Sequence, residues 1–452
     1  MRGLAKNSGS ITKNILALGL LLGGAGCGAD RDTDRAPETT PAGKAPASAP
    51  GPAAPVAARP APLRVSGVLE YSGGMRGFVP AGTAATEATA FQRRVGSLLT
   101  ETQVSGAVAA RQYFLVYKDT DLRPTPFAKM RDVVQGLQSD AALGTELPEM
   151  LEAILSRPAA ATEVSVIVSD FIYGPQDPTK IPLIADYIRT AVASVGSRGL
   201  AVAVLAERSG FVGTYHPAVK TPVARRQMKG EKVPYYVWVV GPPALVGRYL
   251  SEVATGLPAE QAYFGLRFAS VPFAVVLDGL PPSSPLAPSG GASVSYAGAK
   301  ASPELDIEDV RQTAEFTVAL NLARLPAAWQ EPAFLAGQLR AELPGGAAPQ
   351  LVPGSVRRLT AAELAAAPLA AHTHVLRLRL NALPAGQSTL ALRLAAPDVP
   401  AWAAEWSTTN DNLPGPLART YRLTDILAGL RAAFPPALPP VFTVQLRLTN
   451  QD

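Results

Sequence analysis

The stretch Val164-Ser-Val-Ile-Val168 decides the fold of the first half of this 452-residue chain. Its nearly continuous apolar character returns in Val237-Trp-Val-Val240. Strands that are apolar on both faces are typical of a parallel sheet covered by helices on both sides, because a sheet with one face in water alternates apolar and polar residues. These two stretches therefore predict an α/β domain.

Strand-like and helix-like segments alternate along the chain on either side of residues 164–168. A short apolar strand at 65–69 precedes a helical pattern over 86–102, which is the opening of a βαβ unit. The same periodicities predict further strands at 113–117, 200–205 and 235–240, and further helices at 127–137, 147–155, 181–195 and 243–254. We therefore predict a doubly wound, mostly parallel sheet over residues 63–258.

The second half of the chain has the pattern of antiparallel strands. Leu376, Leu378 and Leu380 alternate with Arg377 and Arg379, which is typical of a strand with one buried face. Comparable strands between Pro and Gly turns are expected at 273–277, 316–322, 389–394 and 441–448, with one amphipathic helix over 423–434. We predict a β-rich, sandwich-like C-terminal domain over residues 259–452.

The N-terminus has the order of a secretory signal peptide. Arg2, Lys6 and Lys13 lie in a stretch without acidic residues, an apolar run follows at 15–22, and small residues lead to Cys27. An apolar helix of about a dozen residues rises roughly 18 Å, which is too short for a hydrocarbon core of roughly 30 Å. We therefore predict a signal peptide over residues 1–26 rather than a transmembrane anchor.

Cys27 is the only cysteine of the chain, so an intramolecular disulfide is impossible. Ala25-Gly26-Cys27 resembles the end of a bacterial lipobox, which implies that cleavage exposes Cys27 and that lipid, such as palmitate, is attached there. A lipoprotein of this kind is anchored to a membrane on the extracytoplasmic side, in the periplasm or at the cell surface. Residues 27–62 are rich in Pro and Ala and predict a disordered tether that spans up to roughly 100 Å.

Charge and glycine spacing argue against two classes of ligand. The net charge of +5 includes the three basic residues of the signal peptide, so the remaining chain is only mildly basic and has no basic cluster typical of nucleic-acid binding. The glycine pairs have neither the GxGxxG nor the GxxxxGK spacing of a phosphate-binding loop. We therefore expect neither nucleic acid nor nucleotide as a ligand.

The stretch Val68-Leu-Glu-Tyr-Ser-Gly-Gly-Met75 covers the end of the first predicted strand and the residues that follow it. It resembles the first motif of von Willebrand factor type A (VWA) domains, in which a strand ends in Asp-x-Ser-x-Ser followed by Met. Glu70 stands in place of the aspartate, Ser72 is retained, and Gly74 stands in place of the second serine. Two further pieces follow in the family's order, because Thr145 resembles its loop threonine and Asp170 resembles the aspartate of its third motif.

The resemblance covers about residues 63–255 and implies a VWA/Rossmann-like fold with a metal-ion-dependent adhesion site. Such a site lies in loops beyond the carboxyl ends of parallel strands and binds Mg²⁺ or Mn²⁺ through hard oxygen ligands. Glu70 is one methylene longer than aspartate and Gly74 lacks a hydroxyl, so the site is degenerate. The candidate metal ligands are Glu70, Ser72, Thr145 and Asp170.

The resemblance implies that a protein partner binds at this edge, so the chain would serve protein–protein interaction or envelope assembly. A purely structural interpretation stays open, in which Glu70, Ser72 and Thr145 are turn and cap residues and Asp170 bonds nearby backbone amides. No Gly-x-Ser-x-Gly turn or nucleophile–base pair is present, so we predict no catalytic residues and no enzyme. An envelope hydrolase with a site between the two domains is the alternative from another class.

Three further segments have alternative interpretations. The polar run 406–413 has the composition of a glycan- or calcium-binding loop, although Asn and Asp are ordinary turn formers, and it keeps a glycan-binding surface lipoprotein open. The segment 209–215 predicts either a partner-binding loop or a packed hairpin. His372 and His374 share a face of a predicted strand, and without a third ligand we interpret them as edge or half-buried residues.

Overall fold

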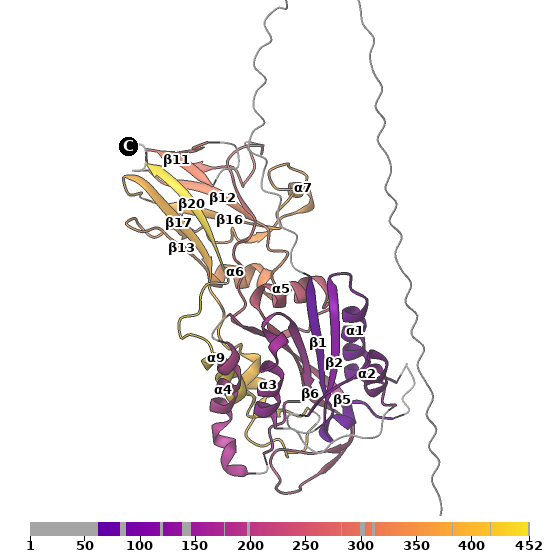
Figure 1. Ribbon diagram of the computed structural model, residues 1–452. Coiled ribbons are helices and arrows are strands. Elements are labelled where there is room, and N and C mark those ends of the chain that lie inside the picture. The colour runs from indigo at the N-terminus through magenta and orange to yellow at the C-terminus, as the bar shows by residue number, and fades with distance from the viewer. Residues whose placement is uncertain are drawn as a thin grey trace, which may run out of the picture. The chain divides into compact units, whose positions relative to one another are not determined.

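The computed structural model describes residues 62–81, 87–117, 121–137, 146–175, 177–196, 199–281, 283–298, 303–309, 312–381, 383–415 and 417–450 (Figure 1). The predicted signal peptide, Cys27, Thr145 and all of the predicted tether except Pro62 lie outside these ranges. Within the ranges, no helix is both long enough and apolar enough to cross a membrane.

The first half of the described chain forms a seven-stranded sheet in the order β3-β2-β1-β4-β6-β5-β7. Its strands are β1 (Leu63–Glu70), β2 (Val108–Val116), β3 (Leu122–Pro124), β4 (Val164–Ser169), β5 (Ala201–Tyr215), β6 (Arg226–Gly241) and β7 (Glu260–Phe264). β1 pairs in parallel with β2 and with β4, whereas the pairings β2·β3, β4·β6, β5·β6 and β5·β7 are antiparallel. The α/β class is confirmed, but the prediction of a mostly parallel sheet is wrong, since the sheet is mixed.

A long hairpin explains this difference. β5 and β6 pair along their whole length, from Ala201 opposite Gly241 to Tyr215 opposite Arg226. Residues 216–225 connect them, which is shorter than the crossover of a dozen or more residues that a parallel pair requires. β6 therefore returns between β4 and β5. Apolar content predicted that both strands are buried, yet it carries no information on strand direction.

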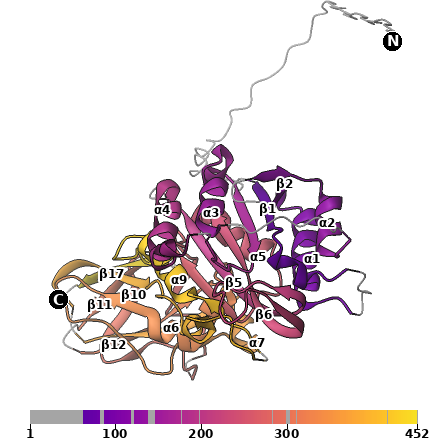
Figure 2. The same cartoon turned by 90° about the horizontal axis from the view of Figure 1, so that it is seen from below.

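Helices cover both faces of this sheet (Figures 1 and 2). One face packs on α1 (Ala90–Val104), α2 (Phe127–Val134) and α5 (Pro243–Glu252), and the other packs on α3 (Leu147–Leu155), α4 (Ile184–Gly196) and α9 (Leu423–Ala432). The side chains of β4 alternate accordingly, because Val166 and Val168 pack in the first core and Ile167 between them packs in the second. Each face of the sheet thus has its own apolar core.

The start of α1 is fixed both locally and by the hairpin. The Thr89 hydroxyl accepts a hydrogen bond from the Gln92 amide (3.1 Å), and the Gln92 side chain accepts one from the Thr89 amide (2.9 Å), which is a capping box. The Phe91 amide donates to the buried Ser209 hydroxyl of β5 (3.0 Å). These contacts hold the N-terminus of α1 against the half of the hairpin that extends beyond the sheet.

The second half of the described chain contains two facing sheets. In one the order is β10 (Ser293–Tyr296), β11 (Glu304–Glu308), β20 (Phe442–Asn450), β17 (Gly386–Leu394) and β13 (Leu339–Glu342). The other contains β14 (Gln350–Leu351), β16 (His374–Leu380), β12 (Ala314–Leu320) and β8 (Phe273–Val276), joined by β9 (Ser289–Gly290) and β15 (Arg357–Arg358). Leu376, Leu378 and Leu380 are buried in the core between the sheets, as their alternation with arginines predicts.

Part of the segment that we assigned to the β-rich domain completes the α/β half instead. β7 is an edge strand of the first sheet, and Ile426 and Leu427 of α9 pack in the same core as α3 and α4. The chain leaves the sandwich after β17 and returns to it only with β20. The sequence predicted α9 as an amphipathic helix, but amphipathicity does not say which core its apolar face joins.

The remaining elements are short. They are η1 (Gly74–Phe78), η2 (Pro158–Ala161), η3 (Pro178–Leu183), η4 (Ala327–Gln330), α6 (Pro332–Gln338), α7 (Ala361–Leu364), α8 (Trp402–Trp406), β18 (Ser407–Thr408) and β19 (Thr420–Tyr421). Among them η1 bears on function, because it follows β1 directly and packs along the outer half of β5.

Candidate functional site

Three of the four predicted metal ligands meet at one edge of the first sheet. Glu70 ends β1, Ser72 follows two residues later, and Asp170 follows β4. β1 and β4 are parallel neighbours with Leu69 opposite Val168, so their carboxyl ends lie together. Glu70, Ser72 and Asp170 are 6 %, 4 % and 5 % exposed. The fourth predicted ligand, Thr145, lies outside the described residues.

Hydrogen bonds hold both carboxyl groups of this cluster. The Ser169 hydroxyl donates to Glu70, and the Phe171 amide donates to the Ser169 hydroxyl (3.0 Å). The Ile172 amide donates to Asp170 Oδ1 (3.0 Å), which is the backbone contact that the structural interpretation predicts. Asp170 Oδ2, by contrast, faces Gly74: a Cβ placed on Gly74 would lie 3.2 Å from it and 3.5 Å from Ser72 Oγ.

The backbone is strained directly after Asp170. Phe171 has φ +52°, in the left-handed region that aromatic residues rarely adopt. Its ring stacks on Tyr236 (centroids 5.4 Å apart) and meets Trp238 edge-on (4.6 Å), and these contacts hold the conformation. Strain of this kind costs on the order of 1–3 kcal/mol and concentrates at functional sites. Here it fixes the direction in which Asp170 leaves the strand.

Burial gives the two carboxyl groups unusual proton affinity. It raises the pKa of Asp170 to about 8, and the nearby Glu70 carboxylate adds to that increase. Burial also raises the pKa of Glu70, although hydrogen bonds from Ser169 and Ser72 act in the opposite direction. Two acids that share a buried site cannot both ionise cheaply, so the cluster holds a proton at neutral pH when no cation is present.

A third buried carboxylate near Asp170 was not predicted as part of the site. Asp411 accepts hydrogen bonds from the Ala218 amide (2.7 Å), the Val219 amide (3.1 Å) and the Tyr215 hydroxyl (3.3 Å). The Asn412 side chain donates to the Val219 and Val223 carbonyls (2.8 and 2.6 Å). The polar run considered as a glycan- or calcium-binding loop therefore turns these two side chains inward, where they hold the tip of the β5–β6 hairpin.

An open pocket of about 520 Å³ lies beside the cluster, between η1, the end of α2 and the hairpin tip. Arg76, His216 and Arg225 line it, together with Leu137 and Val212. The two arginines had no recognisable local signal in the sequence, since one comes from η1 and the other from the hairpin. Within the segment 209–215, Phe211 and Tyr215 are buried, as a packed hairpin predicts, whereas Val212 is exposed and lines the pocket.

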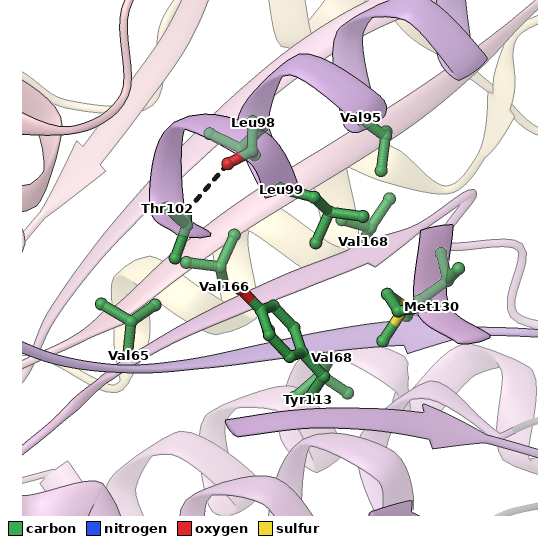
Figure 3. Close-up of a pocket in the computed structure, with 12 residues that line it drawn as sticks. Val65, Val68, Val95, Leu98, Leu99, Thr102, Tyr113, Met130, Val166 and Val168 are labelled. Carbon is green, nitrogen blue, oxygen red and sulfur yellow. Dashed lines mark hydrogen bonds between the residues drawn. The ribbon is translucent and has the colours of Figure 1, made fainter. Parts of the chain in front are cut away.

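A second cavity is a packing space in the core and not a ligand site. It has a volume of about 10 Å³ and lies under α1, lined by apolar side chains such as Val65, Leu98 and Val166 (Figure 3). The one hydrogen bond drawn there runs from Thr102 Oγ1 to the Leu98 carbonyl (2.8 Å). A space of this size holds about one water at most, and a stable water needs several polar partners.

The described residues contain no group of three or more His, Cys, Asp and Glu side chains placed to hold a metal ion. The Glu70, Ser72 and Asp170 cluster offers two carboxylates and one hydroxyl. His374 is buried, and its ring nitrogens bond the Thr373 hydroxyl and the Gln330 carbonyl (2.8 Å each). It is therefore a structural core residue.

Comparison with protein-family models, curated proteins and solved structures found no match to this chain.

Proposed function

We propose that this protein is a lipid-anchored protein of the cell envelope that binds another protein at the carboxyl edge of its first sheet, through a degenerate adhesion site of the VWA type. The observation that carries the proposal is the convergence of Glu70, Ser72 and Asp170 on two adjacent parallel strand ends. Open α/β sheets bind their ligands at this edge. The lipid on Cys27 and the tether over 27–62 would hold this edge at a distance from the membrane.

The donor chemistry of the cluster suits Mg²⁺ or Mn²⁺. Two carboxylates and a hydroxyl are hard oxygen ligands, and Gly74 places no side chain against Asp170 and Ser72. A bound cation would neutralise the two buried acids and supply an open position for an acidic group of the partner. Glu70, Ser72 and Asp170 would hold the cation, while Phe171 and Ser169 keep the carboxylates oriented.

The test measures the thermal midpoint of the purified full chain, after chelation, during titration with Mg²⁺, Mn²⁺ and Ca²⁺. A ligand that binds only the folded state raises this midpoint, by about 2.7 kcal/mol in stability at 100 times its Kd. We expect a saturable rise that Asp170→Asn abolishes. Asp186→Asn on the surface of α4 is the matched control and should keep the rise. No rise with any ion would contradict the cation.

Protein binding and anchoring need separate readouts. Cells that express the chain with Cys27→Ser should release it from the membrane fraction and should not label it with radioactive palmitate. Chemical crosslinking in intact cells should capture a defined partner with the wild type and with Asp186→Asn, and fail with Asp170→Asn. A partner captured equally by all three proteins would place binding elsewhere on the molecule.

A further inference from the structure

The pocket beside the cluster has an excess of positive charge. Arg76 and Arg225 are exposed, and within the described part of the chain neither guanidinium has an ion-pair partner. None of the described residues that line the pocket is acidic. The pKa of His216 is lowered by burial and, in addition, by the nearby charges of Arg225 and Lys220. Among the described residues, the lining of the pocket therefore carries positive charge that no acidic lining residue offsets.

Apolar side chains are exposed at the same place. Leu137 is 64 % exposed and Val212 is 47 % exposed, and both line the pocket. Val223 and Leu413, at 46 % and 63 %, lie on the hairpin tip and on the loop that holds it. Exposed aliphatic residues that gather beside unpaired arginines are typical of a surface that a partner covers.

Several glycines contribute to the lining of the pocket, namely Gly73, Gly77, Gly136 and Gly213. Gly213 has φ +132°, and a Cβ placed on it would lie 3.9 Å from Gly77 Cα, so the backbones of β5 and η1 approach closely there. A Cβ placed on Gly77 would meet the Phe211 ring, and one placed on Gly136 would meet the Val79 and Pro80 carbonyls, so these two glycines allow close packing within the protein.

We propose that this pocket binds an extended segment of a partner protein in which acidic and aliphatic side chains alternate. Arg76 and Arg225 pair with its carboxylates, since the guanidinium fork matches a carboxylate with two parallel hydrogen bonds. Leu137 and Val212 pack against its aliphatic side chains. This inference rests on the proposed function and specifies the partner chemistry. A free anion would leave the aliphatic residues unused, and a flat lipid surface would not fill a concave pocket.

The probe is a fluorescein-labelled twelve-residue peptide in which Glu alternates with Leu, and its counterpart with Gln in place of Glu. Binding to the purified full chain is followed by fluorescence anisotropy. We expect saturable binding of the Glu peptide only, weakened by NaCl, because the contacts are partly exposed ion pairs. Arg76→Gln with Arg225→Gln should weaken it by about tenfold or more. Arg64→Gln, an exposed arginine at the opposite end of β1, is the matched control and should bind like the wild type.

A second pair of variants tests the apolar contribution. Leu137→Ser and Val212→Thr should weaken binding of the Glu peptide by several fold while leaving its dependence on NaCl unchanged. All these side chains are exposed, so the thermal midpoints should stay at the wild-type value. Equal binding of the Glu and Gln peptides, or equal binding by the arginine variant, would overturn the inference.

Competition separates the other sources of negative charge. Displacement of the peptide by citrate or inorganic phosphate at micromolar concentration would point to a small anion and overturn the peptide assignment. Stronger binding to phosphatidylglycerol vesicles than to the peptide would point to a membrane surface and would also overturn the peptide assignment. A crosslinked partner lost in Asp170→Asn but retained in the double arginine variant would overturn this pocket and leave the proposed function standing. If the wild type captures no partner and binds no peptide, the proposed function and this inference are both overturned.

Discussion

Buried acidic residues have different partners at the two ends of strands β1 and β4. Near their amino ends, Glu163 is 3 % exposed and forms an ion pair with Arg157, whose guanidinium also donates to the hydroxyls of Ser66 and Ser165 (3.3 Å each). At their carboxyl ends, Glu70 and Asp170 are equally buried, and no Lys or Arg of the described residues forms an ion pair with either.

The difference favours a structural role for Glu163 and is consistent with the ligand-binding role proposed for Glu70 and Asp170. Burying an ion costs several kcal/mol, and a matched partner with further hydrogen bonds repays most of that cost. Arg157 does this for Glu163, so the amino end needs no other explanation. At the carboxyl end no described Lys or Arg pairs with the acids, and burial raises the pKa of Glu70 and Asp170 instead. Acids with strongly raised pKa values at a strand edge are typical of sites that bind a cation or a ligand.

The largest expected effect comes from breaking the matched pair. Arg157→Met leaves Glu163 buried without a cation, so the free energy of unfolding should fall by about 4 kcal/mol. Urea unfolding at neutral pH measures it. Arg189→Met, which removes an exposed partner of Asp186, should cost no more than about 1 kcal/mol. An equal loss in the two variants would mean that the amino end is not specially compensated, and the contrast between the ends would disappear.

The next effect comes from removing the titration of Asp170. The pKa of Asp170 is about 8 in the folded chain against about 3.9 when unfolded, so between these values the folded state binds a proton that the unfolded state has lost. The stability of the wild type therefore falls as pH rises from about 4 to about 8. Asp170→Asn lacks this loss.

The measurement is the difference in unfolding free energy between Asp170→Asn and the wild type, in the presence of a chelator. It should grow in favour of the variant by on the order of 3 kcal/mol between pH 5 and pH 7. Asp186→Asn should show no such trend. A difference that is independent of pH would show that Asp170 is ionised at neutral pH and that the carboxyl end is compensated after all.

The sequence predicted the acids at the carboxyl ends of these strands and made no prediction for Glu163 and Arg157 at the amino ends. Apolar runs located β1 and β4, and the parallel pairing of two strand ends made it possible to predict that Glu70 and Asp170 meet. The alternation of Leu376 to Leu380 with arginines likewise predicted a strand with one buried face. In these segments the pattern is local, because the apolar residues of a strand themselves indicate which of its faces are buried.

Other parts of the site depend on contacts between distant residues. Asp411 contacts the hairpin tip about two hundred residues earlier in the chain, and Arg76 and Arg225 line one pocket because the β5–β6 hairpin packs along η1. No periodicity encodes either contact. The Asn and Asp run that contains Asp411 predicted a turn. It did not predict which backbone amides donate hydrogen bonds to the Asp411 carboxylate.

The smallest expected effect comes from adding a hydroxyl to the cluster at the carboxyl ends of β1 and β4. Gly74→Ser adds a hydroxyl beside Asp170 Oδ2 and Ser72 Oγ, where a Cβ would lie 3.2 and 3.5 Å away. Gly74→Ala adds the same Cβ without the hydroxyl and is the matched control. If the cluster holds a cation, the serine should strengthen Mg²⁺ binding by about 1 kcal/mol, which is the usual contribution of one added polar contact, and the alanine should not.

The readout is the Mg²⁺ concentration that gives half of the maximal rise in thermal midpoint, which should fall several fold in Gly74→Ser alone. Without Mg²⁺, both variants should stay within about 1 kcal/mol of the wild type, because Asp170 must move by only a few tenths of an ångström. Identical behaviour of serine and alanine would mean that the added hydroxyl meets no cation. The two carboxyl groups would then depend on a shared proton, and partner binding would depend on the arginine-lined pocket beside them.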